Sequence, residues 1–458
     1  MEKAVSPRSL AWIAATAFFM QALDTTILNT ALPTIATDLH QSPLQMQLAV
    51  ISYALTVALF IPISGWLADK YGTLNIFRFA VTMFVLGSVS CAFSMSLEML
   101  IFSRILQGFG GAMMMPVARL AIIRTVPKNE LLPIWNLMAM AGLTGPIIGP
   151  ILGGWLVTYA SWHWIFLINI PIGLVGILLS SFFMPNVKNQ LSKFDWQGFL
   201  LFASGLVCVT LGLDLISETF VEKWQASSVL GVGCLFLLAY YFYAKGKSEV
   251  LIPLSLFQVR TYNLGSWSNL FIRLCGSGIP FLLPLMLQVS FQYSADYAGY
   301  MVTPIAISSL ISKPFIRPLL KWLGYRKLLM INSLCMAVAV GLMCLLTINT
   351  PLWAYISLLF IYGMILSIMF TSVNTLTVSE LDHHNASAGS TMLSVIQQVG
   401  IGLGIAVSAI ALNFYRSFVA PEMLQQAFSY TFLTSSIFGV ILFFIVAKLD
   451  KSDGENLH

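Results

Sequence analysis

A single acidic residue, Asp24, lies within the first long apolar stretch of this chain, and Arg104 lies within the fourth. A charged side chain in such a stretch is costly to bury, so it usually marks a function. A buried carboxylate can bind and release a proton; burial favours its neutral form, and a nearby guanidinium favours its charged form. We therefore expect a proton-binding site with Asp24 as the titrating group and Arg104 as its modulator. A permanent structural ion pair is the alternative.

The surrounding sequence places both residues on membrane helices. The chain has 458 residues, of which 58% are hydrophobic and only 9% are charged, whereas a soluble domain has about 25% charged residues. Apolar runs of about 20 residues recur along the whole chain, so we predict an all-α polytopic membrane protein. The expected helices are 10–32, 46–68, 76–95, 99–122, 132–157, 164–184, 196–216, 226–245, 263–289, 296–317, 328–348, 352–377, 388–412 and 427–447.

The distribution of lysine and arginine predicts the orientation of these helices. With the amino terminus inside, the outer loops hold only Lys223 and Arg416, and an even number of helices places both termini in the cytoplasm. The inner loops hold Lys70, Arg78, Arg124, Lys128, Lys188, Lys193, Lys245, Lys247, Arg260, Arg317, Lys321, Arg326 and Lys327.

Helix geometry predicts that the two candidate residues lie at similar depth. Asp24 is eight residues before the outer end of the first helix, or roughly 12 Å at 1.5 Å per residue. Arg104 is six residues after Glu98, near which the fourth helix enters from the outer side, or roughly 9 Å. The two side chains can therefore face each other.

The chain also contains a faint internal repeat. Gly65-Trp-Leu-Ala-Asp69-Lys-Tyr-Gly72 follows the second helix, and Arg317-Pro-Leu-Leu-Lys321-Trp-Leu-Gly324 follows the tenth, with a final glycine at the same place. Two related six-helix bundles with an extra helix pair between them are typical of one large transporter class. We expect bundles at 1–190 and 251–458, joined by a helix pair at 191–250.

The first of these loops resembles the loop signature of the major facilitator superfamily. Glycines allow a tight turn, and an aspartate at a helix end can pair with a cation. The resemblance implies that Asp69 latches the inner side, with Arg78, Arg119 or Arg124 as its partner. The sequence departs from the family pattern at Thr73 and Leu74, where basic residues are usual.

Further segments resemble the fourteen-helix drug:proton antiporters of that superfamily. Leu23-Asp24-x-Thr26-x-x-Asn29-x-Ala31-Leu32-Pro33 is similar to their first helix, and Arg104-Ile-Leu-Gln107-Gly108 to their arginine motif. Ser161-Trp-His-Trp-Ile-Phe-Leu-Ile-Asn169-Ile-Pro171 is similar to their sixth-helix entry, with His163 in place of arginine. The glycine-rich fifth helix resembles the antiporter motif, although simple helix packing with proline kinks is the alternative. Its residues are Gly142, Gly145, Pro146, Gly149, Gly153 and Gly154.

The second half contains one cation near the predicted midplane. Arg273 is about ten residues into its helix, roughly 16 Å deep, and precedes Gly276, Gly278 and Pro280, which can loosen the helix. Arg104 and Arg273 then outnumber Asp24, the one clear acid at membrane depth. This excess of positive charge favours an anionic substrate such as a polycarboxylate. Satisfaction of backbone carbonyls by Arg273 is the alternative.

Other polar residues within the helices are expected either to contact substrate or to bond neighbouring helices. Lys313 lies nearer the inner surface, where its long side chain can reach water. The remaining candidates are Gln21, Thr25, Asn29, Gln107, Asn136, Asn269, Gln288, Asn374, Gln397 and Gln398.

These features predict a proton-coupled efflux transporter, an antiporter, in a bacterial inner membrane. It would export drug-like or anionic organic compounds and act as a monomer. A proton-coupled importer of a small organic anion is the main alternative, and a passive channel is another. No catalytic motif occurs at membrane depth and no cysteine spacing suits a metal, so we expect no enzyme activity, cofactor, metal or nucleic-acid partner. His383 and His384 are expected in a solvated loop.

Overall fold

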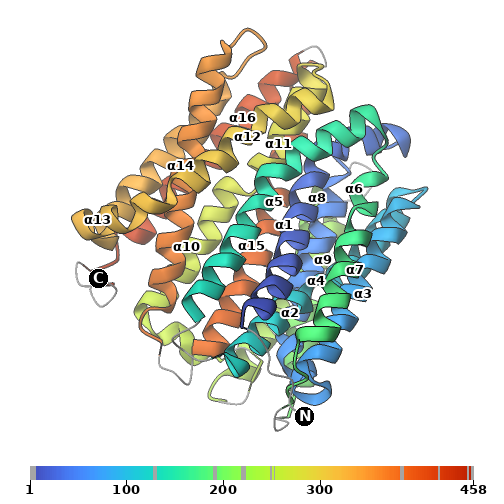
Figure 1. The fold of residues 1–458 in the computed structure, drawn as a ribbon. Helices are drawn as coiled ribbons and strands as arrows, with labels where there is room; N and C mark the ends of the chain where they lie inside the picture. Colours follow the sequence, from blue (N-terminus) through green and yellow to red (C-terminus); the bar gives the residue numbers. More distant parts are fainter. Residues whose placement is uncertain are drawn as a thin grey trace. The chain divides into compact units, whose positions relative to one another are not determined.

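A computed structural model describes most of the chain as α-helices joined by short turns (Figure 1). The described residues contain no β-strand. They are 7–126, 131–188, 193–217, 223–247, 250–251, 253–381, 386–420, 423–450 and 453–454.

The first half contains seven helical segments, of which α6 and α7 form one span. They are α1 (Pro7–Asp38), α2 (Gln47–Tyr71), α3 (Thr73–Ala92), α4 (Leu97–Thr125), α5 (Leu131–Tyr159), α6 (Trp164–Leu167) and α7 (Asn169–Phe183).

The extra helix pair and the second half follow. The pair is α8 (Trp196–Ser217) and α9 (Lys223–Ala244). After it come α10 (Arg260–Gly276), α11 (Ile279–Leu285), the π-helical turn η3 (Met286–Ser290), α12 (Ala295–Ile311), α13 (Lys313–Leu342), α14 (Leu352–Val378), α15 (Ala386–Arg416) and α16 (Leu424–Val446).

The described helices account for the fourteen predicted spans. Twelve helical stretches are long and apolar enough to cross a membrane, and α5 and α12 complete the set. The ninth span is loosened after Arg273, as predicted, because α10 ends at Gly276 and α11 starts at Ile279. The tenth prediction, 296–317, missed the break at Ser312, where α12 ends and α13 starts.

The chain forms two compact units. The first contains residues 1–194 and 287–303, and the second contains 195–286 and 304–458. The extra helix pair therefore packs within the second unit, where α8 contacts both α9 and α15. Residues 287–303 pack within the first unit, and the chain enters this segment inside the π turn η3.

The two repeated glycines have matching backbone conformations. Gly72 has φ 97° and ψ 148°, and Gly324 has φ 71° and ψ 164°. Only glycine adopts this region without strain, so each repeat makes its turn at its final glycine. The expectation that Gly65 also serves the turn was wrong, because Gly65 lies inside α2 and a Cβ there would meet no atom within 4 Å.

Candidate functional site

Asp24 and Arg104 form a fully buried ion pair within the first unit. Arg104 Nη1 lies 2.7 Å from Asp24 Oδ2, and the side chains are 0% and 1% exposed. Arg104 Nε donates to the carbonyl of Ala49 at 3.1 Å, and its guanidinium lies 4.2 Å from the centre of the Tyr53 ring. The expectation that the two residues face each other is confirmed.

Two amide side chains complete the surroundings of the carboxylate. Gln107 Nε2 donates to Asp24 Oδ1 at 2.6 Å, and Asn169 Nδ2 donates to the same oxygen at 3.1 Å. Both amides also donate to Ser88 Oγ, at 2.8 and 3.2 Å. Asp24 therefore accepts hydrogen bonds from three side chains on α4 and α7.

Small residues on α3 and α4 permit this convergence. A Cβ at Gly87 would lie 2.5 Å from the backbone nitrogen of Gln107, so the two helices touch at the level of the cluster. The next residue, Ser88, is consequently held against the Gln107 amide. Sequence analysis gave no role to Ser88, and it used Asn169 only as part of a family-like segment.

Asp24, Ser88, Arg104, Gln107 and Asn169 together form a buried polar cluster. Two of its atoms, Arg104 Nη2 and Asn169 Oδ1, are buried without a hydrogen-bond partner in the described part of the chain. A buried polar group without a partner costs about 1–3 kcal/mol. The cluster thus has spare donor and acceptor capacity, which a group that changes protonation state requires.

The glycine-rich face of α5 packs directly on the helix that carries Asp24. A Cβ at Gly145 would lie 2.7 Å from Leu23 N, and a Cβ at Gly149 would overlap Thr26 Oγ1. Thr26 Oγ1 also lies 3.3 Å from the carbonyl of Gly145, in hydrogen-bond distance. Gly142 and Gly153 face α1 in the same way, whereas Gly154 faces Ala295 and Asp296. These glycine contacts join α1 and α5 along several turns. Pro146 lies on the same helix as the glycines.

Asp69, near the end of α2, pairs with Arg124 of α4 at 2.6 Å. This partner was one of three expected. The other two, Arg78 and Arg119, have exposed side chains. Asp69 and Arg124 are each about one-fifth exposed, at 21% and 20%.

Arg273 of α10, in the second unit, lies against an aromatic ring rather than an acid. Its guanidinium lies 4.7 Å from the centre of the Phe370 ring on α14. Its side chain also packs on α15, since a Cβ at Gly400 would lie 2.8 Å from Arg273 Cδ. Within the described residues Arg273 has no ion-pair or hydrogen-bond partner, and its Nε is buried.

Other predicted polar residues of the second unit lie on α10, α13, α14 and α15. Asn269 is fully buried, and its Oδ1 has no partner in the described part of the structure, although Nδ2 donates to the Gly265 carbonyl. Gln397 Nε2 donates to Asn374 Oδ1 at 3.0 Å, which joins α15 to α14. Lys313 Nζ donates to Thr371 Oγ1 at 2.8 Å, so Lys313 is held by α14.

The other predicted polar residues are dispersed along the helices. Gln288, in η3, donates to the Thr30 carbonyl within the first unit at 2.9 Å. Thr25 bonds within α1, to the carbonyl of Gln21, and Asn29 Oδ1 is buried without a partner among the described residues. Gln21 and Gln398 are half-buried. The side chain of Asn136 and the loop residues His383 and His384 lie outside the described residues.

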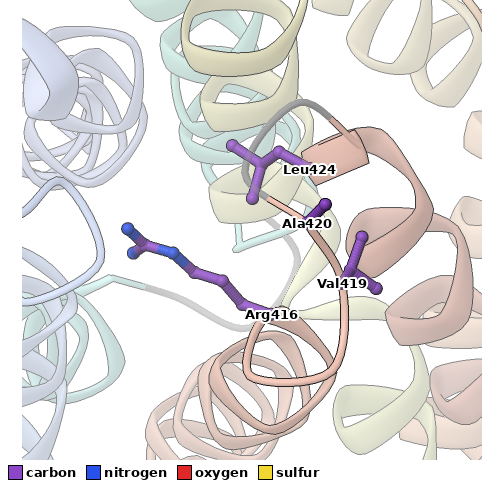
Figure 2. A pocket seen from close by; sticks show the side chains of 4 residues that line it. All are labelled: Arg416, Val419, Ala420 and Leu424. Carbon is purple, nitrogen blue, oxygen red and sulfur yellow. The ribbon is translucent and has the colours of Figure 1, made fainter.

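A pocket at the junction of α15 and α16 involves none of these residues. Figure 2 shows it lined by Arg416, Val419, Ala420 and Leu424. Its walls come from one short connection, and among the described residues that line it only Arg416 is polar. It is therefore a surface hollow rather than a site for chemistry.

The fold agrees with the comparisons with known proteins. Residues 14–405 match the family model of the Major Facilitator Superfamily. The chain belongs to this superfamily and is a multi-pass membrane transporter.

Two relatives resemble the chain along nearly its whole length. The Haemophilus influenzae protein HsrA, named as a probable transport protein, is 56% identical and covers 98% of this chain and 97% of its own. The Escherichia coli protein MdtD, named for multidrug resistance, is 39% identical, with 99% and 97% covered.

Solved structures share the fold at low identity. A D-xylose–proton symporter aligns with a TM-score of 0.70 and 13% identity, covering 98% of this chain and 99% of its own. A point mutant of the nucleoside transporter NupG aligns with a TM-score of 0.67 and 14% identity, with 95% and 98% covered. These likenesses concern the fold alone.

Proposed function

We propose that this transporter exports small organic compounds in exchange for protons. The observation that carries the proposal is the buried cluster in which Asp24 accepts hydrogen bonds from Arg104, Gln107 and Asn169. A carboxylate so enclosed has to regain its hydrogen-bonding balance whenever it binds a proton. Its ionisation can therefore select between two states of the carrier.

Proton binding at Asp24 would weaken the buried pair. Burial of an ion pair is tolerated only while both charges and their remaining hydrogen bonds are satisfied. Neutral Asp24 leaves the Arg104 charge without a counterion, so a second conformation becomes comparatively favourable. The membrane potential contributes about 2.3 kcal/mol for each charge moved across 100 mV, in addition to any pH gradient.

Two observations support export rather than import. The relative MdtD is named for multidrug resistance. The close contact of the α5 glycines with α1 also suits the glycine-rich antiporter pattern that the fifth helix resembles. We propose a bacterial inner-membrane location with both termini in the cytoplasm, on the strength of the lysine and arginine distribution.

Inverted membrane vesicles with an imposed pH gradient test the proton coupling. We expect wild-type vesicles to accumulate an exported compound, and a protonophore to abolish the accumulation. Asp24→Asn, which cannot release a proton, is expected to lose accumulation while folded protein remains. Asp450→Asn is the matched control, since Asp450 forms an exposed ion pair with Arg260. Normal proton-driven accumulation by Asp24→Asn would reject the proposal, and accumulation only in right-side-out vesicles would indicate an importer.

We also propose that Arg273 binds an anionic group of the substrate. Asp24 already neutralises Arg104, so the acid expected at membrane depth is not available to Arg273. Its position over the Phe370 ring leaves the guanidinium free to receive a carboxylate bidentately. The neighbouring amides of Asn269 and Gln397 can supply further hydrogen bonds.

A comparison of two probes tests this substrate class. Tricarballylate, a tricarboxylate, and ethidium, a lipophilic cation, are offered to the same vesicles. We expect wild type to accumulate tricarballylate in preference to ethidium. Arg273→Gln should reduce the accumulation of tricarballylate by roughly tenfold or more. Arg273→Lys should retain part of it, because lysine keeps the positive charge but not the two-pronged geometry of the guanidinium. Preference for ethidium in wild type would overturn the anionic class and leave proton coupling intact.

A further inference from the structure

Both amides beside Asp24 are arranged for its charged form. Gln107 Nε2 and Asn169 Nδ2 each donate to Asp24 Oδ1 and to Ser88 Oγ. An ionised carboxylate only accepts hydrogen bonds, so two amide donors satisfy it. A protonated carboxyl is different, because its O–H must donate to an acceptor.

The contacts of the carboxyl oxygens indicate where the proton binds. Oδ2 faces Arg104 Nη1 at 2.7 Å, and a guanidinium has no acceptor atom. A proton on Oδ2 would therefore point at a donor. The proton consequently binds Oδ1, and one of the two amides must turn its carbonyl oxygen toward it.

The two amides differ in their freedom to do so. Gln107 Oε1 already accepts from Arg104 Nη1 at 2.5 Å, and Cys91 Sγ lies 3.8 Å from the same oxygen. Rotation of Gln107 would thus break the link to Arg104. Asn169 Oδ1 is buried and has no partner in the described part of the chain, so its rotation breaks only the two donations it makes.

We propose that Asn169 is a positioning residue that reverses its hydrogen bond when Asp24 is protonated. It donates to the carboxylate, and after a half-turn of its side-chain amide group it accepts from the neutral carboxyl. Ser88, whose hydroxyl both donates and accepts, can then donate to the rotated carbonyl. This inference rests on the proposed proton coupling at Asp24.

The position of Asn169 connects this reversal to a helix. It is the first residue of α7, where α7 follows α6 through Ile168, whose backbone is helical (φ −61°, ψ −23°). The helix α7 packs on both α1 and α3, which carry Asp24 and Ser88. A change in the amide therefore occurs where α7 packs on the helices that carry Asp24 and Ser88.

Infrared difference spectroscopy of the purified full-length protein across a pH change tests the reversal, with the proton as the only ligand. The protein carries asparagine labelled with a heavy isotope in its amide carbonyl. We expect a labelled band to shift together with the Asp24 carboxyl band. This coupled shift should disappear in both Asp24→Asn and Asn169→Leu, and persist in Asn332→Leu, whose amide bonds the Ile365 carbonyl in the second unit.

Transport by the same variants adds a functional readout. Asn169→Leu is expected to reduce proton-driven accumulation of tricarballylate or ethidium by about tenfold, because the neutral carboxyl then lacks its acceptor. Exchange of labelled for unlabelled probe without a gradient should change little. Asn169→Ser, which can donate and accept, should restore most of the accumulation.

The outcomes separate this inference from the proposed function. If the Asp24 carboxyl never titrates in wild type, the proposed proton coupling fails and the role of Asn169 falls with it. If Asp24 titrates while the labelled asparagine band stays constant, the role of Asn169 alone is refuted. An equal loss of accumulation and exchange in Asn169→Leu would also refute it, since a merely structural residue behaves so.

Discussion

At the scale of residues, the sequence indicated charges better than it indicated their neutral partners. Asp24 and Arg104 stand out because charge is rare in apolar stretches, and helix geometry placed them at similar depth. Ser88 and Asn169 could not be selected in this way. Serine and asparagine are common in membrane helices, and only the packing of α3 and α7 brings these two to the carboxylate.

The buried pair gives a stability prediction in which the two single variants differ. In Arg104→Gln, the unpaired Asp24 can take up a proton and so escape a buried charge. In Asp24→Asn, the unpaired Arg104 keeps its charge at any accessible pH. We expect Asp24→Asn to cost roughly 3–5 kcal/mol at all pH values, the usual cost of breaking a buried pair.

We expect Arg104→Gln to cost less than Asp24→Asn, because a carboxyl that can become neutral is buried at lower cost than an unpaired guanidinium. Thermal unfolding in detergent between mildly acidic and mildly alkaline pH measures both variants. Equal destabilisation by the two variants would contradict this difference.

At the scale of elements, hydropathy predicted the spans but not their interruptions. Apolar composition continues through Ser312, so no change of pattern marks that break, whereas Gly276, Gly278 and Pro280 indicated the one at 277–278. The backbone there is set by packing and by glycine and proline. Likewise, the loop pattern alone could not show that Gly72 makes the turn whereas Gly65 lies inside α2.

That difference between Gly65 and Gly72 is testable. Gly72 has a positive φ, and a Cβ there would overlap the side-chain amide of Asn186. Gly72→Ala is therefore expected to destabilise the protein by roughly 1–3 kcal/mol through strain and crowding. Gly65→Ala should be neutral or stabilise by up to about 1 kcal/mol, because alanine suits a helix interior.

Thermal unfolding of the two purified variants measures this contrast. Each serves as the control for the other, since both replace a glycine of the same loop signature with the same residue. Equal destabilisation would mean that the signature acts as a whole, and that the helical position of Gly65 is irrelevant.

At the scale of the whole molecule, the sequence predicted an extra helix pair but not which unit it packs with. The second unit holds it through side chains at the ends of the pair. Asp195, just before α8, accepts from Tyr243 on α9 at 2.7 Å and from the backbone of Leu251 at 3.0 Å, and it also caps α8 at Gly198. Tyr243 and Leu251 are 48 and 56 residues from Asp195 in the chain, beyond the reach of local sequence patterns.

The hydrogen bonds of Asp195 predict how the pair is retained. Asp195→Ala removes all three, and each bond to a charged group contributes roughly 1.5–3 kcal/mol. We expect amide hydrogen exchange to rise about tenfold or more at the start of α8 and around 250–256, because those segments lose their shared acceptor. The interior of α8 and α9 should change little, since Gly205 and Gly212 pack against Leu237 and Leu230 independently of Asp195. Mass spectrometry of the purified protein in detergent resolves these segments, with Asp450→Ala as the control acid. Unchanged exchange at 250–256 would mean that apolar packing of Tyr240 and Ala244 with Val250, Leu254 and Met392 is sufficient to hold the pair in the second unit.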